Sequence, residues 1–333
     1  MGLSQWDLIK ECLGPSYTQE ESLVTFLTPE ASTRRYFRIT LKKEPNFSKI
    51  LCLYQKGEED SFERYREMST FLHQKKVAIP KILTIVKKSL AMVLEDLGEV
   101  HALDFLIKAS QEKRASFLSS CVKEILLPYH QTQKEEVPNS CVSRILDSNF
   151  MEKEIEKTLD FFPKAFNKEL KKDEKEEIFL DFQKLFLFLE KVPKVWTHRD
   201  FHSRNLLFLN NKIICIDFQD SLWAPYGYDL VSLLEDCYFS HAQVHKQEII
   251  DLFWSSSEQK EQSILIYSSL ALQRLFKAIG SFCFVFVQTG NPKFLPAVGV
   301  AMEKIRCILE SKEMNFFELN GLKHRLLNYY YKV

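Results

Sequence analysis

The sequence predicts an α+β fold in which a small antiparallel sheet with one inserted helix precedes a larger, mainly helical part. Short runs rich in β-branched and aromatic residues, punctuated by Pro, Asn and Gly, fill the N-terminal region. Longer runs with helical spacing follow, and the 333 residues include only 9 glycines. We place the boundary at residue 96, which gives an N-terminal part, 1–96, and a C-terminal part, 97–333.

The N-terminal part begins with a short helix, and a second helix follows the third predicted strand. This second helix covers residues 59–74, where apolar side chains recur three and four positions apart. Pro80 ends the connection to the next strand. The predicted strands cover residues 23–27, 35–39, 50–54, 81–86 and 90–94.

The C-terminal part is predicted to be helical except at residues 206–216. There two apolar runs flank Asn210 and Asn211, a pair that tolerates positive φ and therefore favours a tight β-hairpin. The charged run 168–177 is typical of a solvated helix face or a helix–helix turn.

Charge and composition narrow the class of partner and the compartment. Forty-five basic residues balance 45 acidic ones, so no long-range field favours nucleic acid. The most apolar segment, 264–287, is interrupted by Gln273, Arg274 and Lys277, which argues against a membrane span. The N-terminus does not resemble a signal peptide. We therefore expect a cytoplasmic protein without nucleic-acid or membrane partners, whose oligomeric state the sequence leaves open.

Eight cysteines are scattered through apolar surroundings without a CxxC pair or a Cys/His pair at metal-ligand spacing. This distribution predicts buried thiols in a reducing compartment rather than a disulfide framework or a zinc site.

The segment that begins at His198 carries the chemistry. It reads H-R-D-x-x-x-x-N, with Asp200 and Asn205 as its polar positions, and Asp217 follows at the end of the predicted hairpin. Phosphoryl transfer needs a carboxylate that orients a hydroxyl and accepts its proton, together with oxygen ligands for Mg²⁺. Asp200 fits the first role. Asn205 and Asp217 fit the second, because a hairpin brings its two ends close together.

Other roles exist for these residue types. Asp200 and Asp217 could be capping or turn residues, but their order, their separation and the intervening hairpin favour the phosphoryl-transfer reading. For His198 and His202 we expect structural hydrogen bonding within the loop, since the partners of a zinc site are absent from the sequence nearby.

The chain resembles the aminoglycoside phosphotransferase/choline kinase superfamily, and most of all its branch of anomeric N-acetylmuramate/N-acetylglucosamine 1-kinases. The resemblance implies a bilobal protein-kinase-like fold with ATP between the lobes. Four stretches, spread over nearly the whole chain, carry it: residues 31–38, 94–98, the catalytic segment with 216–220 and 228–230, and 273–280.

The resemblance also implies a nucleotide site. Ser32 and Thr33 would lie in the loop that covers the ATP phosphates, where backbone N–H groups approach the nucleotide. Glu95 and Leu97 would belong to the hinge, whose main chain pairs with adenine. Asp229 would brace the catalytic loop from a helix N-terminus.

The sequence departs from the family pattern at two places. Residues 28–31 lack the usual phosphate-loop glycine, and the third strand lacks the lysine that contacts the α- and β-phosphates. Strand alternation places Arg34 and Arg35 on opposite faces, so one of them should point toward the nucleotide and replace the lysine charge. Arg34 is the first choice and Arg35 the second.

The acceptor is expected to bind on the helical part, opposite Asp200. Arg274 and Lys277 lie three residues apart in an apolar segment, which indicates either contact with substrate or phosphate or a structural ion pair. Trp223 is a candidate for the rim of this site.

Together these features predict an ATP- and Mg²⁺-dependent kinase that phosphorylates a hydroxyl of a small molecule. The acceptor they favour is the anomeric hydroxyl of an amino sugar, in cell-wall recycling. Two alternatives stay open at this point. The acceptor could be an aminoglycoside or choline or another amino alcohol, or the chain could be a nucleotide-binding pseudokinase scaffold, since the lysine is missing.

Overall fold

The computed structural model describes residues 5–27, 34–241 and 243–331. The chain divides into two compact units. The first unit consists of residues Met1–Val100, Glu135–Cys141 and Leu207–Gln219, and the second consists of His101–Lys134, Val142–Leu206 and Asp220–Val333. The first unit therefore runs four residues past the predicted boundary at residue 96, and it also takes in two short segments from later in the chain.

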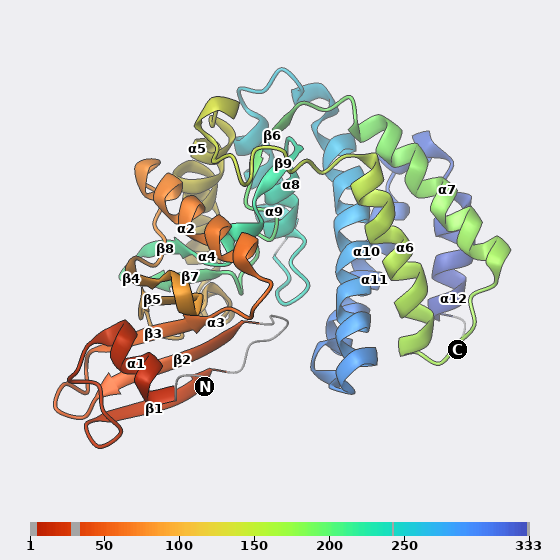
Figure 1. The fold of residues 1–333 in the computed structure, drawn as a ribbon. Helices are drawn as coiled ribbons and strands as arrows, with labels where there is room; N and C mark the ends of the chain where they lie inside the picture. Colours follow the sequence, from red (N-terminus) through yellow and green to blue (C-terminus); the bar gives the residue numbers. More distant parts are fainter. Residues whose placement is uncertain (1–4, 28–33, 242, 332–333) are drawn as a thin grey trace. The chain divides into compact units, whose positions relative to one another are not determined.

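A five-stranded antiparallel sheet forms the first unit, in the order β1-β2-β3-β5-β4 (Figure 1). All five predicted strands are present, each within two residues of its predicted bounds. The strands are β1 (Ser22–Leu27), β2 (Arg35–Leu41), β3 (Ser48–Leu53), β4 (Ile82–Val86) and β5 (Ala91–Glu95).

Two helices accompany this sheet. Helix α1 (Gln5–Leu13) places Ile9 and Cys12 in one core cluster with Ile39 of β2 and Leu51 of β3. Helix α2 (Glu59–Gln74) has the bounds that its apolar spacing predicts, and its face with Phe62 and Tyr65 is buried. Side chains alternate between the two faces of the sheet along each strand, and α1 packs on one of these faces. Tyr36 and Cys52, which are paired across β2 and β3, belong to the opposite face.

The predicted hairpin is confirmed as β7 (Leu206–Leu209) and β8 (Lys212–Cys215). Asn210 and Asn211 have φ values of 50° and 59°, the left-handed pair that a tight two-residue turn requires. Backbone hydrogen bonds from Phe208 to Val100 (3.2 Å) and from Cys215 to Ala78 (2.8 Å) tie the hairpin to the first unit.

The second unit is mainly helical, with a two-stranded sheet of β6 (Lys194–Thr197) and β9 (Leu222–Pro225). Its long central helix, α10, packs against α6 and α11 (Figure 1). The helices are α3 (Ala102–Lys108), α4 (Gln111–Ser120), α5 (Leu127–His130), α6 (Ser148–Ala165), α7 (Lys172–Leu189), α8 (Tyr228–Leu234), α9 (Gln243–Trp254), α10 (Ser263–Thr289), α11 (Leu295–Leu309) and α12 (Leu327–Tyr331).

Helices α6 and α10 approach each other closely at Gly280. A Cβ atom at this position would lie 2.2 Å from Thr158 Oγ1, and that hydroxyl donates a 3.0 Å hydrogen bond to the Phe276 carbonyl. A glycine is therefore needed for α6 to pack on this part of α10. The contact sets the spacing between two helices that carry side chains of the candidate site.

Within the described ranges, one helical segment, Lys260–Thr289, is long and apolar enough to cross a membrane. In its most apolar window 67% of the residues are buried inside the structure. Arg274 and Lys277 interrupt it and are held in ion pairs inside the second unit. The segment serves as the core helix of this unit.

The prediction for the cysteines is confirmed in seven cases and wrong in one. None of the eight, all of which the structure describes, forms a disulfide, and all except Cys307 are buried. Cys307 is exposed because it lies on the outer face of α11, beside Glu303 and its ion-paired neighbour Arg306.

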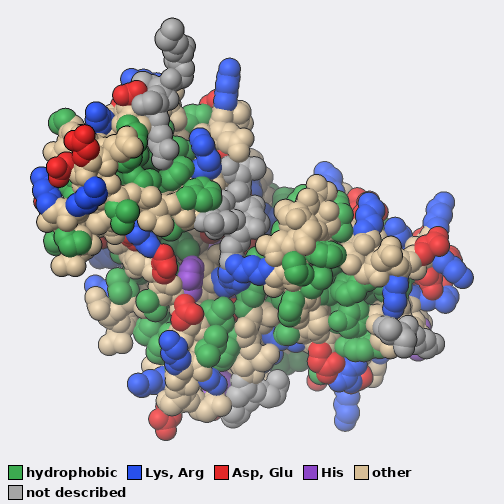
Figure 2. Space-filling view, turned by 90° about the horizontal axis from the view of Figure 1, so that it is seen from below, with side chains coloured by type: hydrophobic (Ala, Val, Ile, Leu, Met, Phe, Trp, Pro, Cys, Tyr) green, Lys and Arg blue, Asp and Glu red, His purple; other side chains and the backbone are tan. Residues whose placement is uncertain are grey.

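Acidic and basic side chains are interspersed on the face drawn in Figure 2. This mixture accompanies the formal net charge of zero.

Candidate active site

The loop between β6 and β7 contains the H-R-D-x-x-x-x-N segment and lies in the second unit up to Leu206. Its backbone is tied to the start of α8. The carboxylate of Asp229 accepts hydrogen bonds from the N–H groups of His198 (2.6 Å) and Arg199 (2.9 Å). Arg199 has a φ of 78°, a left-handed conformation that is costly for a residue with a side chain. Asp229 thus holds the loop in a strained conformation directly before Asp200, which is the bracing role expected for it.

Gly227, directly before α8, allows this arrangement. It has a φ of 100°, and a Cβ atom here would lie 2.7 Å from the Trp254 side chain. Burial raises the pKa of Asp229 to about 7, although its two backbone hydrogen bonds act in the opposite direction.

Asp200 receives two cations from α10 on the same carboxylate oxygen. Lys277 Nζ lies 2.8 Å and Arg274 Nη2 3.1 Å from Asp200 Oδ1. Burial alone would raise the pKa of Asp200, but the positive charges of Lys277 and Arg274 hold it well below its ordinary value. Asp200 therefore stays ionised at neutral pH, and Oδ2 is the oxygen that remains for a reacting group.

Arg274 is fixed from a second side. Its Nε donates a 3.1 Å hydrogen bond to Ser232 Oγ of α8, and its side chain is largely buried. Of the two roles open for Arg274 and Lys277, the ion pair is present, with Asp200 as its partner. Contact with substrate stays a prediction for both.

The far end of the loop is tied down by a second aspartate, which sequence reasoning missed. Asp236 Oδ2, two residues beyond the end of α8, accepts a 2.9 Å hydrogen bond from the N–H of Ser203. Asn205 donates from Nδ2 to the Asp200 carbonyl at 3.0 Å, so its Oδ1 is the atom that can act as a metal ligand. Asp229 and Asp236, seven residues apart, hold both ends of the loop around Asp200.

Structural hydrogen bonding within the loop stays a prediction for the side chains of His198 and His202. The side chain of His198 is buried. The backbone N–H of His198, not its ring, forms one of the two hydrogen bonds to Asp229. Burial lowers the pKa of His202 to about 4, so this imidazole is neutral at physiological pH.

Asp217 lies in the first unit and is held differently. Its Oδ1 accepts hydrogen bonds from Arg34 (3.1 Å) and from Gln219 Nε2 (2.9 Å), while 45% of its side chain is exposed. Its φ of 63° is again left-handed. A half-exposed carboxylate with a strained backbone and one nearby cation is typical of a functional position rather than of a turn residue.

Arg34 is directed to the face of the sheet that carries Tyr36 and Tyr54, with its guanidinium 5.9 Å and 5.7 Å from their ring centroids. Arg35 is exposed, and strand alternation predicts that it faces the other way. The prediction that Arg34 shares a face with Tyr36 is confirmed by the contact of its guanidinium with that ring, and the opposite face for Arg35 stays a prediction. Arg34 is the one that reaches Asp217, and contact of either arginine with a nucleotide stays a prediction.

The segment around Asp96, which the resemblance implies is a hinge, is held by an arginine that sequence reasoning missed. Arg38 donates to both carboxylate oxygens of Asp96, at 2.5 and 3.1 Å, and also pairs with Glu99. The Glu95 N–H donates to the Lys81 carbonyl at 2.9 Å, so Glu95 could offer an adenine ring only its carbonyl. The adenine role of Glu95 and Leu97 stays a prediction.

Three further candidates stay without a test. Ser32 and Thr33 lie outside the described residues. Trp223 donates from Nε1 to the Val142 carbonyl at 3.1 Å and packs edge-on against Trp196 at 5.3 Å. These contacts anchor Trp223 within the second unit, and its place at an acceptor rim stays a prediction.

The residues at hand fit a magnesium ion bound mainly through its substrate. In the part of the chain that the structure describes, no three His, Cys, Asp or Glu side chains form a metal cluster. Mg²⁺ commonly takes only one or two protein oxygens and fills its remaining positions with phosphates and water. The exposed carboxylate of Asp217 and the amide oxygen of Asn205 supply that chemistry. Since they belong to different units, their convergence stays a prediction.

Comparison with known proteins gives the family. An N-acetylmuramate/N-acetylglucosamine kinase from Neisseria meningitidis is 25% identical over 310 residues, which cover 87% of this chain and 86% of that protein. The structure of APH(2")-IIa in a ternary complex with streptomycin and ATP matches with a TM-score of 0.63 at 13% identity, covering 91% of this chain and 97% of that one.

An ethanolamine kinase from Plasmodium vivax has the same fold, with a TM-score of 0.54 at 15% identity, covering 88% of this chain and 84% of that one. These structures show the kinase-like arrangement of an antiparallel sheet followed by a helical part, as predicted. The family model described as the phosphotransferase enzyme family matches residues 24–250, which include Asp96, the loop with Asp200, and Asp217. The chain therefore belongs to the phosphotransferase enzyme family.

Proposed function

We propose that this kinase transfers the γ-phosphoryl group of ATP to the anomeric hydroxyl of an amino sugar, N-acetylmuramate or N-acetylglucosamine. The observation that carries the proposal is the environment of Asp200, a carboxylate kept ionised by two cations in a loop held at both ends. The choice of sugar is supported by the similarity to the Neisseria meningitidis kinase over most of both chains. ATP as the donor is supported by the related ternary complex.

In the proposed reaction, Asp200 orients the sugar hydroxyl and accepts its proton on Oδ2, because Oδ1 is occupied by Lys277 and Arg274. These two cations also fix the carboxylate, so little reorganisation is needed as the hydroxyl approaches. Asn205 and Asp217 would hold Mg²⁺, which neutralises charge on the phosphates. Arg34 would supply the positive charge that the third strand lacks.

The setting we propose is the cytoplasm, in the recycling of cell-wall sugars. The described part of the chain offers one apolar helix, and that helix is mostly buried in the second unit. Its two interrupting cations are paired with Asp200.

A product assay tests the proposal. The purified protein is incubated with ATP and Mg²⁺ and, separately, with N-acetylmuramate, N-acetylglucosamine, kanamycin and choline, and products are detected by mass. We expect a gain of one phosphoryl group on the amino sugars, and loss of that product in Asp200→Asn. Turnover of choline or kanamycin alone would overturn the sugar assignment, and no turnover of any acceptor would favour a scaffold role.

A further inference from the structure

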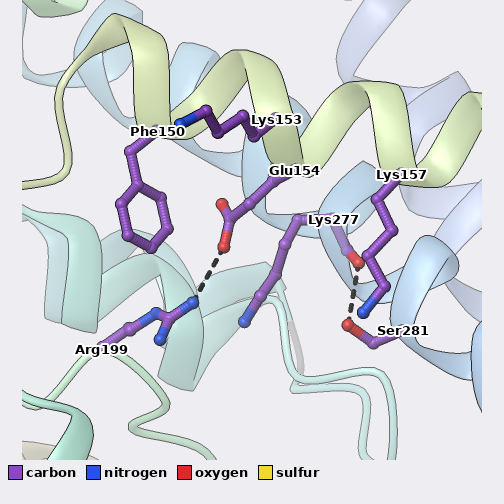
Figure 3. A pocket seen from close by; sticks show the side chains of 7 residues that line it. All are labelled: Phe150, Lys153, Glu154, Lys157, Arg199, Lys277 and Ser281. Carbon is purple, nitrogen blue, oxygen red and sulfur yellow. Dashed lines mark hydrogen bonds and ion pairs between the residues drawn. The ribbon is translucent and has the colours of Figure 1, made fainter.

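A cavity of about 320 Å³ lies in the second unit, between α6, α10 and the loop with Asp200 (Figure 3). Its volume is at the lower end of the ~300–1,000 Å³ range of small-molecule sites. This size suits a single sugar ring better than a multi-ring antibiotic. We call it the α6 lysine pocket, and it is lined by Phe150, Lys153, Glu154, Lys157, Arg199, Lys277 and Ser281.

The lining of the α6 lysine pocket is strongly cationic. Lys153 and Lys157 lie four residues apart, and so share one face of α6. Arg199 and Lys277 add two further positive charges, whereas Glu154 is the single acid among the lining residues. Because Lys277 is paired with Asp200 and Arg199 with Glu154, the excess comes to two positive charges, those of Lys153 and Lys157.

Glu154 does not cancel the two α6 lysines. Its carboxylate accepts hydrogen bonds from Arg199 Nη2 at 3.0 Å and from Gln273 Nε2 at 2.8 Å, and its side chain is 11% exposed. Figure 3 shows Arg199 reaching Glu154 from the catalytic loop, while Lys157 projects beside Ser281. Lys157 Nζ lies 4.1 Å from the centroid of the Phe284 ring, which holds this charge beside α10.

The pocket reaches the proposed reaction centre through one side chain. Lys277 lines it and lies 2.8 Å from Asp200 Oδ1, and Arg199 directly precedes Asp200 in the chain. All of these residues belong to the second unit. An acceptor bound in the α6 lysine pocket would therefore contact Lys277 beside Asp200 as well as Lys153 and Lys157.

We propose that Lys153 and Lys157 are specificity-determining residues that bind a carboxylate on the acceptor sugar. This inference rests on the proposed function and sharpens it. The α6 lysine pocket attracts an acceptor with a negative substituent, accepts a neutral one less well, and rejects a cationic one by like-charge repulsion. The preferred acceptor is a sugar acid.

Three sugars that differ in charge test this selection. N-acetylmuramate carries a carboxylate, N-acetylglucosamine is the matching neutral sugar, and glucosamine carries an ammonium group. We expect kcat/KM to fall in that order in the wild-type enzyme. Added salt should raise KM for N-acetylmuramate more than for N-acetylglucosamine, because screening weakens only the charged contact.

The double variant Lys153→Gln/Lys157→Gln should lower kcat/KM for N-acetylmuramate at least tenfold, mainly because KM rises. The kcat/KM for N-acetylglucosamine should change less than twofold. The matched control is Lys164→Gln. Lys164 lies on the same helix outside the pocket and likewise contacts a ring, with Nζ 5.0 Å from the Phe161 centroid. The control should leave both sugars unaffected. An equal fall for both sugars in the double variant, or no change for either, would overturn the inference.

Calorimetric titration with N-acetylmuramate separates this inference from the proposed function. If the wild type binds the sugar and the double variant does not, the pocket assignment holds even where no phosphorylated product forms. The wild type could instead form product from N-acetylglucosamine, fail to bind N-acetylmuramate in the calorimeter and show no preference for it over N-acetylglucosamine in the kinetics. In that case the kinase assignment holds and the pocket assignment is wrong. Binding by neither protein overturns the pocket assignment as well.

Discussion

Two aspartates, one in each unit, are held in contrasting ways. Asp217 in the first unit meets one arginine, keeps 45% of its side chain exposed and has a left-handed backbone. Asp200 in the second unit accepts two cations on one oxygen, is 25% exposed and lies in a loop fixed at both ends. An exposed carboxylate with a replaceable partner suits a metal ligand that binds and releases an ion. A fixed and ionised one suits a proton acceptor.

The largest effect is expected at Asp200. Asp200→Asn keeps the shape of the side chain but cannot accept the hydroxyl proton, so kcat should fall by about 10³-fold or more. A coupled assay of ADP release with N-acetylglucosamine measures this. Asp160→Asn, which changes an exposed acid on α6 that pairs with Lys175 at 3.7 Å, should keep wild-type activity. Activity of Asp200→Asn within tenfold of wild type would remove Asp200 from the proton-transfer role.

Asp217→Asn should weaken the use of magnesium rather than the fold. We expect a fall of about 10²-fold in kcat/KM, and a higher Mg²⁺ concentration for half-maximal rate, because an amide is a weaker ligand than a carboxylate. The midpoint of thermal unfolding should change little, since an exposed ion pair contributes at most about 1 kcal/mol. An unaltered Mg²⁺ dependence would show that Asp217 is not a metal ligand.

Lys277→Met should change the pH profile. The charge of Lys277 helps to hold the pKa of Asp200 below its ordinary value, so removing it raises that pKa. The acid limb of kcat/KM, measured against pH, should move to higher pH, since protonated Asp200 cannot accept a proton. Arg274→Gln should move it in the same direction. An acid limb that stays in place in both variants would contradict the assigned role of the two cations.

The smallest effect is expected at Arg34. Arg34→Ala should raise KM for ATP about tenfold through loss of one charged contact with phosphate, with little change in kcat. Arg34→Lys should recover part of the loss. Arg35→Ala decides between the two arginines. If KM for ATP rises in Arg35→Ala and not in Arg34→Ala, the phosphate contact belongs to Arg35.

Features set by neighbours in the sequence were predictable. Helix α2 has its predicted bounds because its apolar spacing and its ends are local signals. The Asn210–Asn211 turn follows from the tolerance of asparagine for positive φ. The H-R-D-x-x-x-x-N pattern pointed to Asp200 because the chemistry requires those residue types at that spacing, and the catalytic role stays a prediction.

Features that join distant positions were not predictable in the same way. Arg38 and Asp96 are 58 residues apart, and the hydrogen bond between Ser203 and Asp236 joins positions 33 apart. The spacing of Lys153 and Lys157 on one face of α6 is visible in the sequence. Only tertiary packing brings this face of α6 to α10 beside Asp200. The close approach of the two helices at Gly280 contributes to that packing.

The division of labour between the two aspartates can be tested by titrating ATP with Mg²⁺ into Asp200→Asn and Asp217→Asn side by side in a calorimeter. We predict that Asp200→Asn binds the nucleotide with the wild-type dissociation constant although it does not turn over. We predict that Asp217→Asn loses the part of the affinity that depends on Mg²⁺. Wild-type binding by Asp217→Asn together with weakened binding by Asp200→Asn would contradict the assignment of both residues.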